Sequence, residues 1–100
     1  MRILLYDLVE TEDSLEVGPG VGELLLGPEG AEIHLEDEAR RARLAVLLQG
    51  PLPQRVGDPS GRTRSTRLVH LAPDDPGYLP ALLDRLEHRD LRLHGVPVEG

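Results

Sequence analysis

Histidine and carboxylate side chains that alternate along one predicted strand are the first candidates for chemistry. His34 and Glu36 are separated by one residue, so an extended backbone places both on the same side. Imidazole and carboxylate groups bind zinc and similar metals, and His70 on another predicted strand would supply a third ligand. This spacing is generic, because a histidine that alternates with leucines is more often a surface residue. A metal site or small active site at His34, Glu36 and His70 is therefore the third-ranked hypothesis, and we expect no cofactor.

Arginines near the middle of the chain are the second candidate. They surround a segment whose only acidic residue is Asp58, and they are Arg55, Arg62, Arg64 and Arg67. Guanidinium groups beside the accessible backbone N–H groups of glycines are suited to a phosphate or carboxylate. The segment thus predicts an anion, nucleotide or nucleic-acid site. The alternative, which we favour, is that these arginines pair with acidic residues of this chain or of a second copy.

Missing residue types exclude several chemistries. All eleven basic residues are arginine, so a Schiff-base lysine and a phosphate-loop lysine are excluded, and the absence of cysteine excludes a thiolate nucleophile. Two tyrosines are the only aromatic residues, which makes a stacking platform for nucleic acid unlikely in one copy. No serine lies in a nucleophile-elbow pattern. Whether the protein is an enzyme stays open, and the composition favours a non-catalytic role.

Charge is divided unevenly along the acidic chain, whose net charge is -7. Residues 1–38 hold eleven acidic residues and one arginine, residues 39–67 seven arginines and one aspartate, and residues 68–100 six acidic residues and three arginines. Opposite charges on successive segments favour contact between these segments, or between two copies of the chain. The excess of acid makes nucleic acid an improbable partner.

The first half of the chain predicts strands. The apolar run over residues 2–9 is typical of a central strand, and residues 11–14 form a polar turn. The Gly/Pro-rich residues 17–22 predict a connector, after which a new strand begins at Glu23. Residues 23–26 and 31–35 flank Gly27-Pro28-Glu29-Gly30, which is a hairpin signal.

Residues 37–49 carry the marks of a helix: an Asp cap, acid in the first turn, strong helix formers, and Gly50-Pro51 as the stop. We expect Arg40, Arg41 and Arg43 to form a solvated helix face. Two ion pairs between residues four positions apart should support it, one between Glu36 and Arg40 and one between Asp37 and Arg41. The competing interpretation is a hairpin that turns over residues 37–40.

In the second half, residues 52–61 predict an exposed loop and residues 66–71 a strand. Leucines at 79, 82, 83 and 86 have the spacing of an amphipathic helix over residues 77–89. A short strand with Leu91 and Leu93 follows, ended by Gly95 and Pro97. The order strand, helix, strand over residues 66–94 resembles a βαβ unit, although the tight last connection also allows an antiparallel strand.

These elements predict a single α+β domain over residues 1–100, with a mixed or antiparallel sheet of four or five strands and two helices on one face. The second choice is a mostly β fold with one C-terminal helix. No run of residues is apolar enough for a membrane span, no signal peptide is evident, and the absence of cysteine suits the cytoplasm. The absence of lysine, asparagine and cysteine, with nine prolines, is typical of heat-adapted proteins.

The first-ranked functional hypothesis is a self-associating, non-catalytic interaction or regulatory module. A small sheet leaves an edge and an apolar face uncovered, and a symmetric dimer commonly buries both. We expect Leu24, Leu26 or the stretch 44–48 to contribute to the dimer contact. The identity of any further protein partner is not encoded in a recognisable motif.

Overall fold

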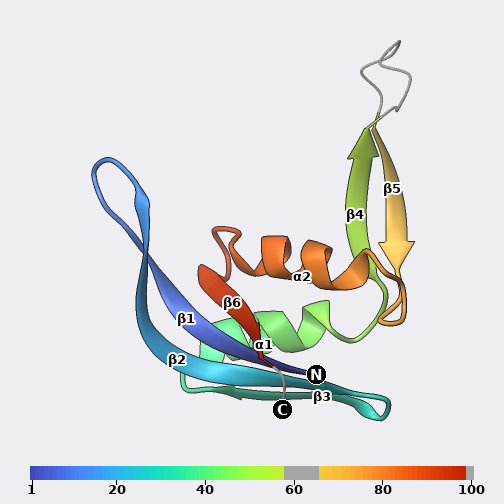
Figure 1. The fold of residues 1–100 in the computed structure, drawn as a ribbon, viewed down its shortest axis with the longest axis horizontal. Helices are drawn as coiled ribbons and strands as arrows, with labels where there is room; N and C mark the ends of the chain where they lie inside the picture. The colour runs from blue at the N-terminus through green and yellow to red at the C-terminus, as the bar shows by residue number, and fades with distance from the viewer. Residues whose placement is uncertain (58–65, 99–100) are drawn as a thin grey trace.

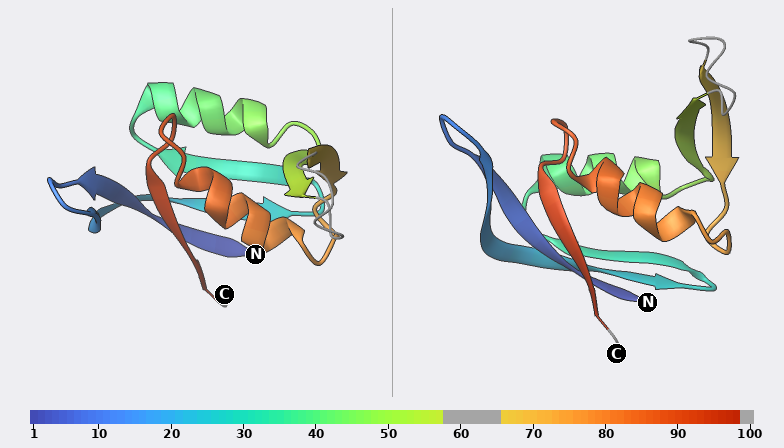
Figure 2. Two further views of the ribbon diagram at one scale, coloured as in Figure 1. Left: turned by 90° about the horizontal axis from the view of Figure 1, so that it is seen from above. Right: turned by 45° about the horizontal axis from the view of Figure 1, so that its top comes forward.

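Two helices pack on one face of a four-stranded antiparallel sheet in the computed structural model (Figures 1 and 2). The structure describes the backbone of residues 1–57 and 66–98, and the side chains of these residues other than 55–57, 66 and 67. In chain order the elements are β1 (Arg2–Glu10), β2 (Leu15–Gly27), β3 (Gly30–Leu35), α1 (Glu38–Leu47), β4 (Leu52–Gly57), β5 (Thr66–Leu71), α2 (Tyr78–Leu86) and β6 (Leu93–Val98). The predicted α+β class is confirmed.

The apolar strand β1 is central, as its sequence predicts. The sheet has the order β3-β2-β1-β6, and β1 pairs antiparallel with both β2 and β6. The predicted βαβ unit is wrong, because β5 and β6 belong to different sheets and β6 runs antiparallel to β1. Strand β6 also continues through Gly95 and Pro97 to Val98, beyond its predicted end. Proline is tolerated there because β6 is an edge strand and one side of its backbone needs no partner.

The Gly/Pro-rich residues 17–22 are part of a strand and not the predicted connector. Strand β2 runs unbroken through them, and its register against β1 shifts between Leu5 and Tyr6 and again between Tyr6 and Leu8. Each shift inserts an extra residue into β2, which bends the strand. Small residues tolerate this bending, and the paired strands curve away from the sheet toward the tip at residues 11–14 (Figure 1). The predicted turn at this tip and the predicted hairpin between β2 and β3 are confirmed.

Helix α1 begins where its capping signal predicts. The Asp37 carboxylate accepts hydrogen bonds from the backbone N–H groups of Ala39 at 3.0 Å and Arg40 at 3.1 Å. This satisfies two of the four N–H groups that lack partners at a helix start. The competing hairpin over residues 37–40 is therefore wrong.

The predicted loop over residues 52–61 is a strand in its first part. Residues 52–57 form β4, which pairs antiparallel with β5 from Leu52↔Leu71 to Gly57↔Thr66. The prolines and glycines of this segment are compatible with a two-stranded ribbon, in which each strand leaves one backbone edge free. The ribbon projects from the end of the helical layer (Figure 1).

The core lies between the sheet and the helices. Its fully buried side chains come from β1, β2, α1, β4, α2 and β6 and from the connection before β6, and they are Ile3, Leu5, Leu24, Leu44, Leu52, Leu82, Leu86, Leu91 and Leu93. The leucine spacing of α2 thus faces the sheet as predicted. Close packing of α2 over β6 requires a small residue at Gly95, because a Cβ there would lie 2.9 Å from a Leu83 methyl group and 3.0 Å from one of Leu86.

Candidate functional site: the open face of the sheet

The face of the sheet opposite the helices carries no covering element among residues 1–57 and 66–98 (Figure 2). Residues paired directly across antiparallel strands point to the same side. Since Ile3 and Leu5 point toward the helices, the residues between and beside them in β1, together with their partners, point away. We call this surface the open face, and its members are Arg2, Leu4, Tyr6, Glu23, Leu25, Glu32, His34, His94, Val96 and Val98.

The middle of the open face is apolar. Leu4, Tyr6 and Leu25 are half-buried by their neighbours on the sheet, as are Val96 and Val98 on β6. None of these five packs against the hydrophobic core of the described residues. Leu4 pairs with Val96 and lies between Tyr6 and Arg2 along its side of β1, so Leu4, Tyr6, Val96 and Val98 occupy adjacent positions. Leu25 lies diagonally from Leu4, and its direct cross-strand partners are Arg2 and Glu32. A contiguous apolar patch of this kind is typical of an interaction surface.

Charged groups on the open face occur mainly as pairs. Arg2 Nε donates to Glu23 Oε2 at 2.7 Å, and His34 Nε2 lies 3.1 Å from Glu32 Oε1. One arginine and two glutamates give the face a formal charge of -1 with neutral histidines, whereas the whole chain carries -7. The open face is thus much less negative than the molecule around it.

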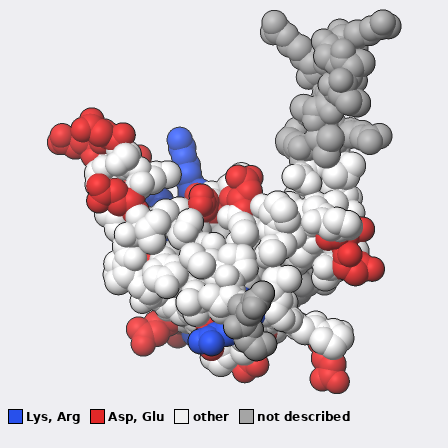
Figure 3. All heavy atoms as spheres, viewed as in Figure 1, with Lys and Arg blue, Asp and Glu red and all other residues white. Residues whose placement is uncertain are grey.

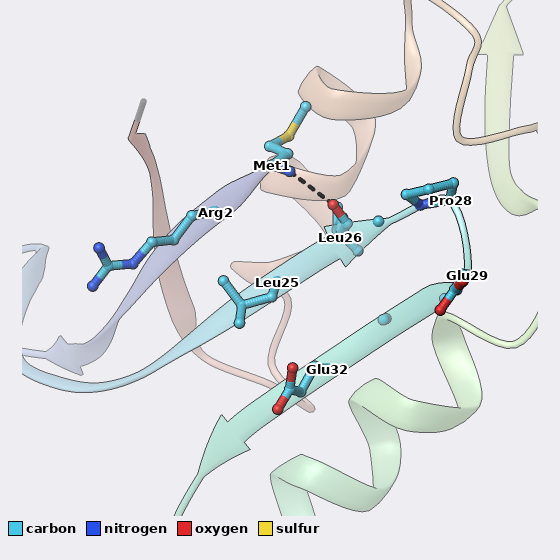
Figure 4. A pocket seen from close by; sticks show the side chains of 10 residues that line it. Met1, Arg2, Leu25, Leu26, Pro28, Glu29 and Glu32 are labelled. Carbon is cyan, nitrogen blue, oxygen red and sulfur yellow. Dashed lines mark hydrogen bonds between the residues drawn. The ribbon is translucent and has the colours of Figure 1, made fainter. Parts of the chain in front are cut away.

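A shallow hollow of about 630 Å³ opens at one end of this face. Arg2, Leu25 and Glu32 line it together with the turn between β2 and β3 (Figure 4). The N-terminal amino group of Met1 donates to the Leu26 carbonyl oxygen at 2.7 Å, which fixes the start of β1 beside β2. The Met1 residue itself is 60% exposed. The hollow therefore combines apolar walls with a guanidinium and a carboxylate group.

The three predicted metal ligands are distributed over two sheets. His34 lies on the open face, Glu36 follows β3, and His70 is exposed on β5 in the two-stranded ribbon. Within the described ranges 1–57 and 66–98, no group of three or more His, Cys, Asp or Glu residues could hold one metal ion. Strand β3 ends at Leu35, so Glu36 lies outside the predicted alternation, and the sequence contained no signal for the sheet to which residue 70 belongs.

The predicted anion site falls largely outside the described residues. Arg62 and Arg64 are among residues 58–65, and only the backbone is described for Arg55 on β4 and Arg67 on β5. Arg67 pairs with Val56 and Arg55 with Leu68, so both arginines belong to the projecting ribbon. The anion, nucleotide or nucleic-acid site at these four residues stays a prediction.

Arg40 is more than part of a solvated helix face. Its guanidinium Nη1 donates to Asp7 Oδ1 at 3.0 Å, and its Nε donates to Asp37 Oδ2 at 3.0 Å. The Asp37 pKa is lowered, chiefly by the backbone hydrogen bond from Arg40 and then by that side chain. The predicted pairs four residues apart are wrong, because the helical partners are three residues apart: Arg40 with Asp37, and Arg41 with Glu38 at 4.0 Å. Positive and negative segments thus meet within one chain.

Most of the residues predicted for the dimer contact are engaged in the chain's own core. Leu24 and Leu44 are fully buried in the chain's own core, and Leu26, Leu47 and Leu48 pack against it. For Leu24 and Leu44 the contact is excluded by this burial, whereas Val46 in the stretch 44–48 is 68% exposed on α1, so a contact through this stretch stays a prediction. The only sequence signal for the open face is that β1 is apolar on both of its sides. A strand that is covered on both sides has the same pattern, so the signal does not distinguish the two cases.

Neither helix of the described residues is long and apolar enough to cross a membrane. Comparisons with protein-family models, with curated proteins and with solved structures return no match.

Proposed function

We propose that this protein is a self-associating, non-catalytic interaction module, and that two copies pair through their open faces. The observation that carries this proposal is the apolar patch of Leu4, Tyr6, Val96 and Val98, with Leu25 beside it, which no element of the described chain covers. Burying such a patch against an identical patch removes apolar surface from water on both copies. A cytoplasmic location fits this proposal and stays a prediction.

Charge supports a second copy as the occupant of the open face. Two molecules of net charge -7 repel each other, so they approach most easily through the surface where charge is nearly balanced. In a two-fold contact the same surface meets itself, which brings Arg2 of one copy toward the glutamates of the other. Glu32 is well placed for this contact because its side chain is 67% exposed.

The size of the face predicts a weak dimer. Four strands about 4.8 Å apart and about six residues long at ~3.4 Å per residue cover roughly 400 Å² on each copy. The two copies together would bury roughly 800 Å² of flat area, below the ~1,200 Å² of a standard stable interface. We therefore expect a monomer and dimer in equilibrium that shifts with concentration.

The test is sedimentation velocity at chain concentrations from about 10 μM to about 1 mM, a range that brackets weak affinities. We expect the wild-type chain to shift toward a dimer as its concentration rises. Leu25→Glu on the open face should stay monomeric throughout. Val46→Glu is the matched control, because Val46 is a 68% exposed apolar residue on α1 and the charge change is the same.

Circular dichroism of both variants establishes that they are folded. A wild-type chain that remains monomeric at the highest concentration would overturn the proposal. So would dimers of equal strength in Leu25→Glu and the wild type.

A further inference from the structure

A broad cleft of about 920 Å³ lies on another part of the molecule, between the tip of the β1–β2 hairpin, the start of α1 and the connection from α2 to β6. Four arginines from two separate segments line it: Arg40 and Arg43 from α1, and Arg89 and Arg92 from the connection. Five carboxylates line it as well: Asp7, Glu10, Glu12, Asp37 and Asp90. Which of these charges are already paired decides what the cleft can bind.

Arg40 is fully engaged in holding the cleft together. Besides Asp7 and Asp37, its Nη1 donates to the Leu91 carbonyl oxygen at 3.3 Å and to that of Arg92 at 3.4 Å. This one side chain therefore ties α1 to β1 and to the segment that precedes β6. Its charge is neutralised by two carboxylates and leaves little attraction for a ligand.

Asp90 is engaged in the same way by a residue outside the cleft. Arg85 donates to both of its carboxylate oxygens, at 2.7 Å and 2.8 Å, and this pairing lowers the Asp90 pKa to about 2. Asp90 therefore cannot also neutralise the arginines of the cleft. Its backbone carbonyl oxygen accepts a hydrogen bond from Arg43 Nη1 at 2.9 Å, which places the Arg43 guanidinium against the connection.

Two guanidinium groups of the cleft remain without a carboxylate. Among residues 1–57 and 66–98, neither Arg43 nor Arg89 forms an ion pair within 4.0 Å, and Arg92 reaches Glu10 only at 3.5 Å. Guanidinium groups bind phosphate oxygens through two parallel N–H donors, and they do so more strongly where several converge. Arg43 and Arg89 therefore offer guanidinium donors to an oxyanion, while the lining as a whole holds five carboxylates and four arginines.

The backbone of Arg92 adds an independent observation. Its φ is 51°, in the left-handed region that L-residues adopt at a cost and that favours glycine or asparagine. The strained turn is held by hydrogen bonds from Arg92 N to His88 O at 2.7 Å and from Leu8 N to Arg92 O at 3.0 Å. These two hydrogen bonds fix the position of the Arg92 backbone at the edge of the cleft.

We propose that this cleft binds a small phosphorylated molecule through Arg43, Arg89 and Arg92. Glu10 and Glu12 at the hairpin tip border the same cleft and would repel a long polyanion. The acidic tip therefore favours a compact phosphate-bearing molecule over a nucleic-acid strand. This proposal is independent of pairing through the open face, to which none of the three arginines belongs.

The probes are inorganic phosphate and phenyl phosphate, each titrated at low salt, about 50 mM, where charge-driven binding is strongest. Backbone amide shifts in NMR spectra report where each probe binds, and sodium chloride of matched ionic strength shows which shifts come from screening alone. We expect saturable shifts at residues 89–92 and at the start of α1. Tighter binding of phenyl phosphate would identify an organic phosphate as the ligand, and equal binding would identify the phosphate group alone.

Arg89→Gln tests the role of the unpaired guanidinium, with Arg41→Gln as the control of equal charge change on the exposed surface of α1. We expect Arg89→Gln to weaken phosphate binding by about tenfold, because it removes one charge-assisted contact of about 1.4 kcal/mol. Arg41→Gln should leave phosphate binding nearly unchanged. Shifts that do not saturate, or equal weakening in both variants, would overturn the proposal. Thermal unfolding shows that both variants remain folded.

Discussion

Gly22 shows how a single residue limits the packing of the sheet. It pairs with Leu5 on one side and Leu35 on the other, where β1, β2 and β3 approach closely. A Cβ at this position would overlap the carbonyl oxygen of His34 and lie 3.3 Å from the Cα of Leu35. Backbone atoms cannot move aside as a flexible side chain can, so only glycine fits without a shift of β3.

We therefore expect Gly22→Ala to lower the free energy of unfolding by about 1–3 kcal/mol, the usual cost of overpacking. Urea unfolding followed by circular dichroism measures this change. Gly50→Ala is the control, because a Cβ at Gly50 meets no atom within 4 Å and should alter stability by less than about 0.5 kcal/mol. Equal stability of the two variants would show that β3 adjusts freely.

The pair of Arg85 and Asp90 makes a prediction about pH. The Asp90 pKa of about 2 in the folded chain lies below the ordinary value of 3.8, chiefly because the Arg85 side chain donates to the carboxylate. The pair therefore stabilises the folded chain above about pH 4, and this contribution is lost as the pH falls toward 2.

In Arg85→Gln we expect the Asp90 pKa to rise toward 3.8, measured from carboxyl carbon shifts in an NMR titration. The stability lost by the wild type between pH 4 and pH 2 should become smaller in this variant. Arg41→Gln should leave the Asp90 pKa where it is. An unchanged Asp90 pKa in Arg85→Gln would show that another group holds the carboxylate.

Elements with strong local signals were predictable from the sequence. Helix α1 has its cap at Asp37 and ends at Leu47, shortly before Gly50. The β2–β3 hairpin has its turn at Pro28 and Glu29, so hydrogen bonds between near neighbours specify both elements. The Gly/Pro-rich segments in both halves of the chain predict loops, and these predictions are wrong. Residues 17–22 and 52–57 form strands because partners distant in the sequence pair with them, and a local pattern does not contain those partners.

The cap of α1 can be tested as an element. Asp37→Ala removes the acceptor for the N–H groups of Ala39 and Arg40 and also one carboxylate partner of the Arg40 side chain. We expect its urea midpoint to fall clearly below that of the wild type, whereas Asp37→Asn should recover most of the loss because asparagine is an equally good cap. Glu38→Ala, whose side chain is 89% exposed, should change the midpoint least. The opposite ranking would show that the cap contributes little.

At the scale of the whole molecule, one projecting tip is strongly acidic, and the arginines of the cleft lie beside its base. Acidic side chains gather at the tip of the β1–β2 hairpin, which projects on one side, while much of the surface in the same view is uncharged (Figure 3). Four acidic residues surround this tip: Glu10, Glu12, Asp13 and Glu16. The β4–β5 ribbon, on whose strands Arg55 and Arg67 lie, projects elsewhere (Figure 1). The ribbon backbone and the acidic hairpin tip therefore project from different parts of the molecule.

This arrangement gives the proposed dimer a salt dependence. Two copies of charge -7 repel each other over distances comparable to the Debye length, about 10 Å at 0.1 M salt, while an apolar contact is not weakened by salt. Raising the salt concentration should therefore strengthen dimers in the sedimentation experiment. Dimers that dissociate in salt would point to ion pairs as the main contact, against the proposed apolar one.

The sequence by itself determined the α+β class, the central strand, the capped helix and the amphipathic helix, because each depends on spacing within a few residues. Tertiary structure alone decided which face of the sheet stayed uncovered and which arginines kept a free charge. Leu24 and Leu25 are adjacent in sequence and equally apolar, yet one is buried in the core and the other lies on the open face. Arg40 and Arg43 are separated by less than one helical turn, and only Arg40 meets two carboxylates. Burial and charge pairing depend on neighbours that folding brings from elsewhere in the chain, so no local pattern specifies them.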